Sequence, residues 1–128
     1  MAQVLVSRGA FQRGSKLVFL SGRMGSLQDT ASGGRPDGCY GYRMSKCALN
    51  MAAVLLAREL APEGVAVSLV DPGKVATGLS SFTGCTAGVD GWQHPRDAAE
   101  ACIEHVLAGP SEPAPVVNVR HDGVVTGW

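Results

Sequence analysis

The sequence predicts an α/β fold with about three parallel strands and flanking helices, and two observations indicate it. Short apolar runs of strand length alternate with longer helical segments along the chain, without internal repeats. The runs at residues 16–21 and 65–70 are mostly apolar instead of alternating, which is typical of parallel strands buried on both faces. A chain of 128 residues has the size of one domain and can bury a real core.

The first third of the chain combines a helical pattern, a strand and a loop. Residues 1–13 mix apolar and polar positions at helical spacing, and Gly14 would end that helix. The strand at 16–21 follows. Residues 22–41 are rich in Gly, Ser, Asp and Pro, so we expect a loop there.

The most regular helix is predicted at residues 42–60, which contain neither Gly nor Pro. The Ala-Pro-Glu-Gly sequence at 61–64 ends it, and the second strand follows directly. That strand stops at Asp71-Pro72-Gly73. Several glycines interrupt residues 74–93, which we expect to be irregular.

The C-terminal part contains one more helix and one more strand. Pro95 suits the first turn of a helix that would run to about Leu107. A linker rich in Pro and Gly follows, and residues 116–119 form the third predicted strand.

Composition excludes several classes of function. The 11 basic and 11 acidic residues balance and only 5% of residues are aromatic, so we expect no nucleic-acid partner. We expect no membrane attachment either, because the apolar runs are shorter than the roughly 20 residues that cross a bilayer. The N-terminus also lacks the pattern of a signal peptide.

The cysteines and histidines lack the spacing of a metal site. Cys39, Cys47, Cys85 and Cys102 form no Cys-x-x-Cys pair, and the three histidines are scattered. The sequence therefore predicts neither a zinc site nor a disulfide framework, and reduced thiols in a cytoplasmic protein are expected.

Tyr42 and Lys46 lie one helical turn apart and form the most informative pair in the chain. An ammonium on the same helix face favours the phenolate, and so does the positive end of the helix dipole, so we expect a lowered pKa for Tyr42. Such a phenol could exchange a proton with a carbonyl or alcohol oxygen. Taken alone, this spacing more often marks an ordinary pair on a helix surface.

Two strand ends are expected beside this pair. Active sites of open parallel sheets lie beyond the carboxyl ends of the strands. Here the strand-end segments are residues 21–25 and 71–77. Together with the start of the 42–60 helix they would surround one crevice, which favours a chemical role for Tyr42 and Lys46.

The segments around this crevice resemble the short-chain dehydrogenase/reductase family, and in particular its sniffer-type and C-factor-like carbonyl reductases. The similar segments are residues 17–26, 42–46 and 71–77, and the ending with Val117-Asn118-Val119, Asp122-Gly123 and Trp128. The resemblance implies that residues 1–128 are the C-terminal half of a Rossmann-like, doubly wound parallel sheet.

The resemblance also implies a role for each matching residue. Tyr42 would pass a proton to the carbonyl oxygen as hydride arrives from NAD or NADP, and Lys46 would lower the pKa of Tyr42 and hold the nicotinamide ribose. Thr77 would lie near the phosphates. The residues expected to border the nicotinamide are Pro72, Gly73, Val75 and Thr77. The substrate would be a small-molecule carbonyl or alcohol.

Two departures from the family concern the substrate side of the crevice. The family's substrate-orienting serine is the second residue of a Ser-Ser pair, whereas this chain has Ser21-Gly22. Either Ser21 or Ser26 substitutes for it, or polarisation of the substrate oxygen is weakened at Gly22. The loop at residues 33–38 is also longer than in the sniffer-like subgroup, which would reshape the substrate mouth.

The largest departure is the N-terminal half of the family, which this sequence does not contain. No Gly-rich turn follows a first strand to bind a pyrophosphate, and the family's catalytic asparagine has no counterpart. The strand at 16–21 would then present an open edge.

Three interpretations follow. In the first, the chain is part of an NAD(P)-dependent oxidoreductase whose chemistry needs a longer chain. The second is a non-catalytic protein that dimerises or regulates, and a homo-oligomer would form through the 42–60 helix, as that helix does in the family. The third, a hydrolase, is disfavoured because no Gly-x-Ser-x-Gly sequence occurs.

Overall fold

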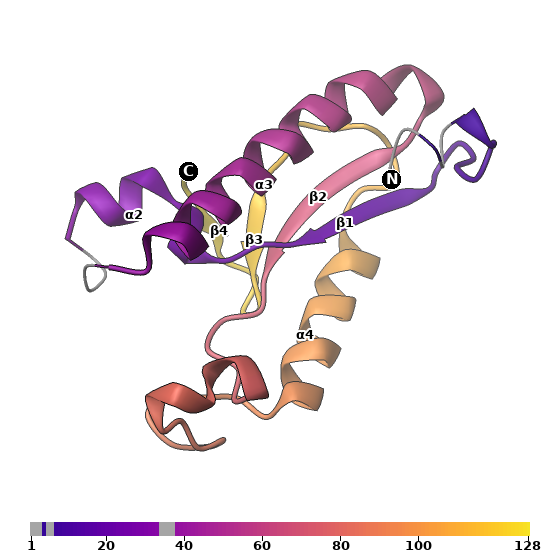
Figure 1. Cartoon of the computed structure of the whole chain (residues 1–128). Helices are drawn as coiled ribbons and strands as arrows, with labels where there is room; N and C mark the ends of the chain where they lie inside the picture. The colour runs from indigo at the N-terminus through magenta and orange to yellow at the C-terminus, as the bar shows by residue number, and fades with distance from the viewer. Residues whose placement is uncertain (1–3, 5–6, 34–37) are drawn as a thin grey trace.

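The computed structural model of the chain describes residues 4, 7–33 and 38–128. They form a four-stranded sheet in the order β1 (Lys16–Leu20), β2 (Ala66–Asp71), β3 (Asn118–Arg120) and β4 (Val125–Thr126). β1, β2 and β3 are parallel, and β4 is antiparallel to β3 (Figure 1). The predicted α/β fold with three parallel strands is confirmed, and β4 is an addition to it.

Two long helices cover opposite faces of this sheet (Figure 1). α3 (Tyr40–Leu60) packs on one face, where Ala53 meets Val65, Val67 and Leu69 in the hydrophobic core. α4 (Pro95–Ala108) lies on the other face. Side chains of a strand alternate between faces, so the mostly apolar β2 can pack against both helices.

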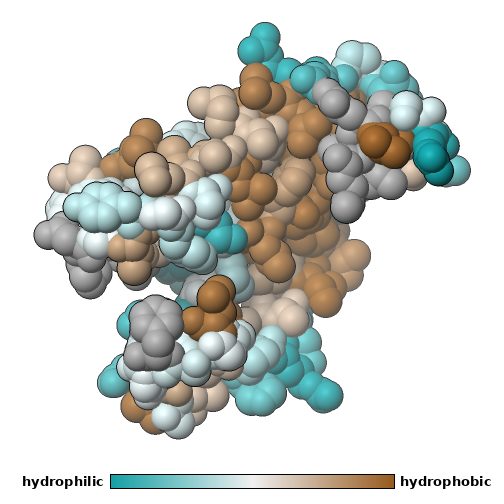
Figure 2. All heavy atoms as spheres, in the orientation of Figure 1, coloured by the Kyte–Doolittle hydropathy of each residue, from teal (hydrophilic) through white to brown (hydrophobic). Residues whose placement is uncertain are grey.

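β1 forms one edge of the sheet within the described residues, as expected from the sequence. The surface along β1, between α3 and α4, is hydrophobic (Figure 2). Leu20, its last residue, is 60% exposed. This edge is therefore a place where a further strand could pair.

Lys16 ties the start of β1 to the end of α4. Its Nζ donates to the carbonyl oxygens of Val106 at 2.8 Å, Leu107 at 3.2 Å and Gly109 at 2.7 Å. The last carbonyls of a helix have no partner within it, and a cation there also meets the negative end of the helix dipole. This contact fixes α4 against the sheet.

The expected loop at 22–41 was wrong in part. It contains a short 3-10 helix, η1 (Arg23–Gly25), and one helical turn, α2 (Leu27–Ala31). The Oγ of Ser26 accepts from the amide of Asp29 at 3.1 Å, which caps α2. Of the long loop at 33–38, residues 34–37 lie outside the described residues.

Other boundaries also need correction. α3 begins two residues earlier than predicted, at Tyr40, and β3 covers 118–120 instead of 116–119. The segment expected to be irregular, 74–93, contains the 3-10 helix η3 (Gly78–Thr83). After α3 the chain forms the 3-10 helix η2 (Ala61–Glu63) and turns at Gly64, whose φ is 72°, as the sequence indicated.

The predicted helix at residues 1–13 lies partly outside the described residues, namely at 1–3 and 5–6. Val4 and Ser7 are helical, but the chain turns at Gly9, with a φ of 65°, so this helix ends before the predicted stop at Gly14. Among the described residues, no helix is both long and apolar enough to cross a bilayer.

Candidate functional site

The carboxyl ends of the three parallel strands meet at one edge of the sheet, as the sequence predicted. The amide of Ser21, after β1, donates to the carbonyl oxygen of Val70 at 2.8 Å. The amide of His121, after β3, donates to the carbonyl oxygen of Asp71 at 2.9 Å. The residues that follow β1, β2 and β3 therefore lie side by side.

Tyr42 and Lys46 lie at the start of α3, beside this edge. Tyr42 is the third residue of α3 and is 42% exposed. The Nζ of Lys46 lies 5.7 Å from the centroid of the Tyr42 ring and donates to the carbonyl oxygen of Leu20 at 2.9 Å. The end of β1 thus holds the ammonium next to the phenol.

Gly25 brings the turn after β1 into direct contact with α3. A Cβ built on Gly25 would lie 2.8 Å from the backbone carbonyl carbon of Lys46 and 3.1 Å from the amide nitrogen of Cys47. Backbone atoms at these distances cannot move aside cheaply. Only glycine lets η1 pack on the helix at the level of Lys46, which explains how Lys46 reaches Leu20.

The pKa of Tyr42 departs from its usual value in the direction opposite to the one expected. Burial of the phenol raises this pKa, and the negative charge of Asp71 raises it further. The expected lowering of this pKa was wrong, because neither the burial of the phenol nor the carboxylate that reaches the site from β2 is visible in the sequence. The phenol of Tyr42 therefore stays protonated at neutral pH.

Ser21 is not aimed at the same crevice as Tyr42. It is 4% exposed, and its Oγ donates to the Oδ1 of Asn50 on α3 at 2.5 Å. The amide group of Asn50 in turn donates to the carbonyl oxygen of Gly25 at 3.4 Å. Ser21 therefore connects the end of β1 to α3.

Gly22 has space for a side chain. Its φ of 165° is extended backbone, which any residue can adopt. A Cβ built there meets only the Oδ1 of Asp71, at 3.9 Å. This geometry favours the interpretation in which Gly22, and not Ser21, occupies the position of the family's serine. Ser26, the third candidate, is 2% exposed and caps α2.

The turn after β2 is held in place by its neighbours. Gly73 has a φ of +75°, and a Cβ there would lie 2.5 Å from the imidazole of His121 and 2.8 Å from the side-chain nitrogen of Gln93. That nitrogen of Gln93 donates to the carbonyl oxygen of Pro72 at 3.1 Å. Both the conformation and the crowding require glycine at position 73.

Val75 and Thr77 continue this turn away from the sheet. Val75 pairs with Gln93 in an isolated parallel bridge. Thr77 caps η3, where its amide donates to the Oγ of Ser80 at 2.9 Å and the two hydroxyls lie 3.4 Å apart. The structure thus gives both residues a local structural role.

Asp71 and His121 belong to this site but were not predicted as site residues. Asp71 is 3% exposed, and its carboxylate accepts from the amides of Arg23 at 3.1 Å and Gly73 at 2.9 Å. A clue was present in the sequence, because Asp71 is the polar residue at which a buried strand ends. Nothing in the sequence indicated that the imidazole of His121 lies against Gly73.

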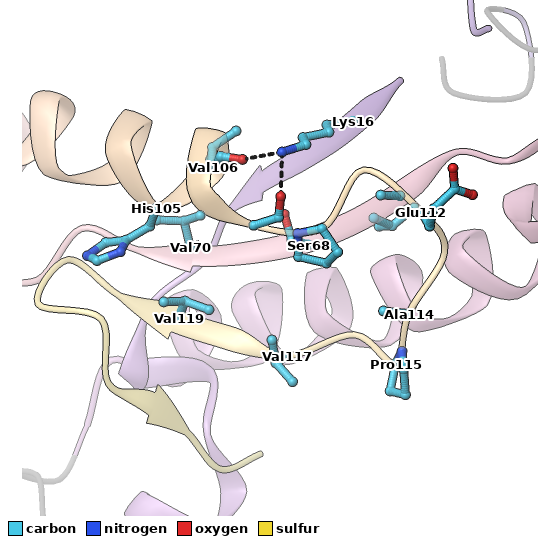
Figure 3. Close-up of a pocket in the computed structure, with 14 residues that line it drawn as sticks. Lys16, Ser68, Val70, His105, Val106, Glu112, Ala114, Pro115, Val117 and Val119 are labelled. Atoms are coloured by element: carbon cyan, nitrogen blue, oxygen red, sulfur yellow. Dashed lines mark hydrogen bonds between the residues drawn. The ribbon is translucent and has the colours of Figure 1, made fainter. Parts of the chain in front are cut away.

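A pocket lies on the other face of the sheet, beneath α4 (Figure 3). Its labelled lining residues come from β1, β2, β3, α4 and the segment after α4: Lys16, Ser68, Val70, His105, Val106, Glu112, Ala114, Pro115, Val117 and Val119. Lys16 is held there by backbone carbonyls. Neither Tyr42 nor Lys46 lines this pocket.

All four cysteines have free thiols.

Two curated proteins are similar in sequence. A 1-hydroxy-2-glutathionyl-2-methyl-3-butene dehydrogenase of Rhodococcus sp. (strain AD45) is 36% identical over 99 residues, which are 77% of this chain and 41% of that protein. The C-signal protein of Myxococcus xanthus is 42% identical over 72 residues, 56% of this chain and 39% of that protein. The matched region is thus about two fifths of each relative. No family model matches the chain.

Several solved structures share the fold. A short-chain dehydrogenase/reductase from Burkholderia multivorans with bound NADP has a TM-score of 0.76 at 23% identity, over 99% of this chain and 50% of that one. The carbonyl reductase Sniffer of D. melanogaster has a TM-score of 0.70 at 22% identity, over 96% and 46%. An NADPH-bound carbonyl reductase from chicken fatty liver reaches 0.71 at 20% identity, over 88% and 42%.

Proposed function

We propose that the chain carries the acid/base residues of an NAD(P)-dependent oxidoreductase. Its fold is that of the short-chain dehydrogenase/reductase family, and it is similar in sequence to a dehydrogenase over part of its length. The reaction would interconvert a small-molecule carbonyl and an alcohol. The chain spans less than half of the curated relatives that it matches, so the activity would belong to an assembly or a longer chain that also binds the rest of the cofactor.

One observation carries this proposal, namely the placement of Tyr42 and Lys46 at the carboxyl edge of the sheet. The phenol is partly exposed there, so a substrate can reach it, and Lys46 is anchored to Leu20 beside it. The turn from Pro72 to Gly73 follows the neighbouring strand. An ordinary surface pair would not require this convergence of three strand ends.

In the direction of carbonyl reduction, Tyr42 donates the proton. The Oη–H bond of Tyr42 would break and its proton would go to the carbonyl oxygen. A reduced nicotinamide, when bound, would supply the hydride that the carbonyl carbon takes up. The product is an alcohol, and the phenolate regains a proton from solvent. Lys46 stabilises the transient phenolate through its positive charge.

The residues present fit the nicotinamide end of such a cofactor. Gly73 gives the turn after β2 a conformation that other residues rarely adopt, and Lys46 holds an ammonium beside Tyr42 that could donate to a ribose hydroxyl. We propose that Pro72, Gly73, Val75 and Thr77 border the nicotinamide, as in the family. The described residues contain no Gly-rich turn between a strand and a helix to hold the pyrophosphate.

A second candidate function is a non-catalytic protein that acts as a homo-oligomer through α3. One side of α3 exposes a series of large apolar side chains, which are Tyr40 at 76%, Met44 at 65%, Met51 at 61% and Leu55 at 49%. Exposed apolar stripes of this kind mark protein interfaces. The oligomer is compatible with both candidate functions, so it does not decide between them.

Binding of cofactor fragments tests the proposal on the chain itself. We expect weak or no binding of NADPH, because the phosphate cradle is missing from the described residues. Reduced nicotinamide mononucleotide at high concentration should shift the amide resonances of Lys46 and Gly73 more than that of Val119, which lines the pocket beneath α4. Shifts centred on Val119 would contradict the proposed site. Low-micromolar NADPH affinity by calorimetry would contradict the claim that the chain needs further residues to hold the cofactor phosphates.

The gene distinguishes the two candidate functions. Coding sequence in frame before Met1 for a Gly-rich strand–turn–helix would favour the oxidoreductase. A stop codon directly upstream, together with a dimer in solution and no nicotinamide binding, would favour the non-catalytic protein.

A further inference from the structure

Asp71 joins segments that are far apart in the sequence. Its Oδ2 accepts from the amide of Arg23, 48 residues away, at 3.1 Å, and its Oδ1 accepts from the amide of Gly73 at 2.9 Å. Arg23 begins η1 after β1, and Gly73 lies in the turn after β2. A single buried carboxylate therefore fixes the two turns that border the candidate site.

The same residue also meets β3 and the space beside Gly22. The carbonyl oxygen of Asp71 accepts from the amide of His121 at 2.9 Å. A Cβ on Gly22 would lie 3.9 Å from the Oδ1 of Asp71. The carboxylate thus lies beneath the position where the family places its serine.

Several titratable groups surround Asp71. The negative charge of Asp71 acts on Tyr42 of α3, on Cys102 of α4 and on Arg120 of β3, and it raises the pKa of each. For Tyr42 and Cys102 burial is the largest cause of the raised pKa, and for Arg120 it is the hydrogen bond with Asp122. The ammonium of Lys46 lies 5.7 Å from the centroid of the Tyr42 ring. Its positive charge favours the phenolate and so opposes the effect of Asp71.

We propose that Asp71 is a positioning residue of the candidate site, whose carboxylate joins the turns at Arg23 and Gly73 and presents a negative charge to the phenol of Tyr42. The inference rests on the proposed function, because it assigns Tyr42 as the proton donor. A negative charge beside the phenol disfavours the phenolate. The phenol of Tyr42 therefore keeps its proton at neutral pH, and transfer of that proton to a carbonyl oxygen depends on Lys46 to stabilise the phenolate that forms.

A titration of the phenol tests the charge effect without requiring turnover. The difference in ultraviolet phenolate absorbance between the parent chain and Tyr42→Phe reports the ionisation of Tyr42. The same difference is measured in an Asp71→Asn background. We expect the midpoint of Tyr42 to move to lower pH, because one negative charge has been removed.

Asp122→Asn is the matched control. Asp122 is an acidic residue near the same strand end, but its carboxylate pairs with Arg120 and is not among the causes that shift the pKa of Tyr42. This substitution should leave the Tyr42 midpoint in place. A midpoint that is unchanged in Asp71→Asn, or that moves equally in Asp122→Asn, overturns the proposal.

A second measurement on the unaltered chain covers the case in which Asp71→Asn fails to fold. The amide protons of Arg23 and Gly73 donate to the same carboxylate, so their chemical shifts should follow one shared midpoint as pH is lowered. Unrelated midpoints would refute the link between the two turns. A shared midpoint in a chain without nicotinamide binding would instead support Asp71 and count against the proposed function.

Discussion

A methyl group at residue 25 would collide with the helix that carries Tyr42 and Lys46. In Gly25→Ala the new Cβ would lie 2.8 Å from both the backbone carbonyl carbon and the Cβ of Lys46. These atoms belong to the regular part of α3 and have no free rotamer to adopt. Either η1 or α3 must shift, and the contact between Lys46 and Leu20 shifts with it.

The expected cost is that of overpacking a close contact, about 1–3 kcal/mol. For a domain of this size that corresponds to a fall in melting temperature of roughly 4 °C per kcal/mol. Gly41→Ala is the matched control, because Gly41 lies in α3 and a Cβ there meets nothing within 4 Å. Alanine is the better helix former, so this variant should gain about 0.5–1 kcal/mol.

Thermal and urea unfolding of the two variants provide the assay. Opposite signs for Gly25→Ala and Gly41→Ala are the expected result. If Gly25→Ala unfolds within about 0.5 kcal/mol of the parent chain, η1 does not pack on α3 at Lys46 as described. The account of how Lys46 is positioned would then fail.

The next predictions concern an active form that includes the rest of the cofactor site, whereas the last prediction, on Lys16, concerns the chain itself. Tyr42→Phe should lower carbonyl reduction by about 10²–10⁴-fold with the fold intact, and Lys46→Ala should lower turnover and weaken cofactor binding together. Gly22→Ser should raise turnover, by up to about 3 kcal/mol of transition-state stabilisation. Ser21→Ala should mainly lower the free energy of unfolding, by about 1 kcal/mol. Loss of turnover in Ser21→Ala with no gain in Gly22→Ser would assign the catalytic serine to Ser21 instead. In the chain itself, Lys16→Met should lower the free energy of unfolding by about 1–3 kcal/mol, and an unchanged urea midpoint would show that the carbonyl contacts of Lys16 contribute nothing.

Much of the fold could be predicted because its signals are local. The apolar runs of β1 and β2 and the long helix without Gly or Pro are visible in the sequence itself. α2 was missed because a helix of five residues depends on its cap, here the Oγ of Ser26, more than on periodicity. β4 was missed because its two residues form a strand only by pairing with β3.

The candidate site divides in the same way. Tyr42 and Lys46 could be predicted because their spacing is a property of one helix. The direction of the shift in the pKa of Tyr42 could not, because it depends on the burial of the phenol in the folded chain and on the charge of Asp71 in β2. The orientation of Ser21 likewise depends on Asn50, which is 29 residues away and reaches it only in the folded chain.

The most direct test of the central claim is turnover by a complete site. The chain would be joined to the half of the NADP-bound Burkholderia multivorans protein that it does not cover, and consumption of NADPH would be followed with small aldehydes and ketones. We expect substrate-dependent consumption of NADPH that falls at least about 10²-fold in Tyr42→Phe while NADPH binding is retained. A folded fusion that binds NADPH but reduces no carbonyl, or one that works equally well with phenylalanine at position 42, would contradict it.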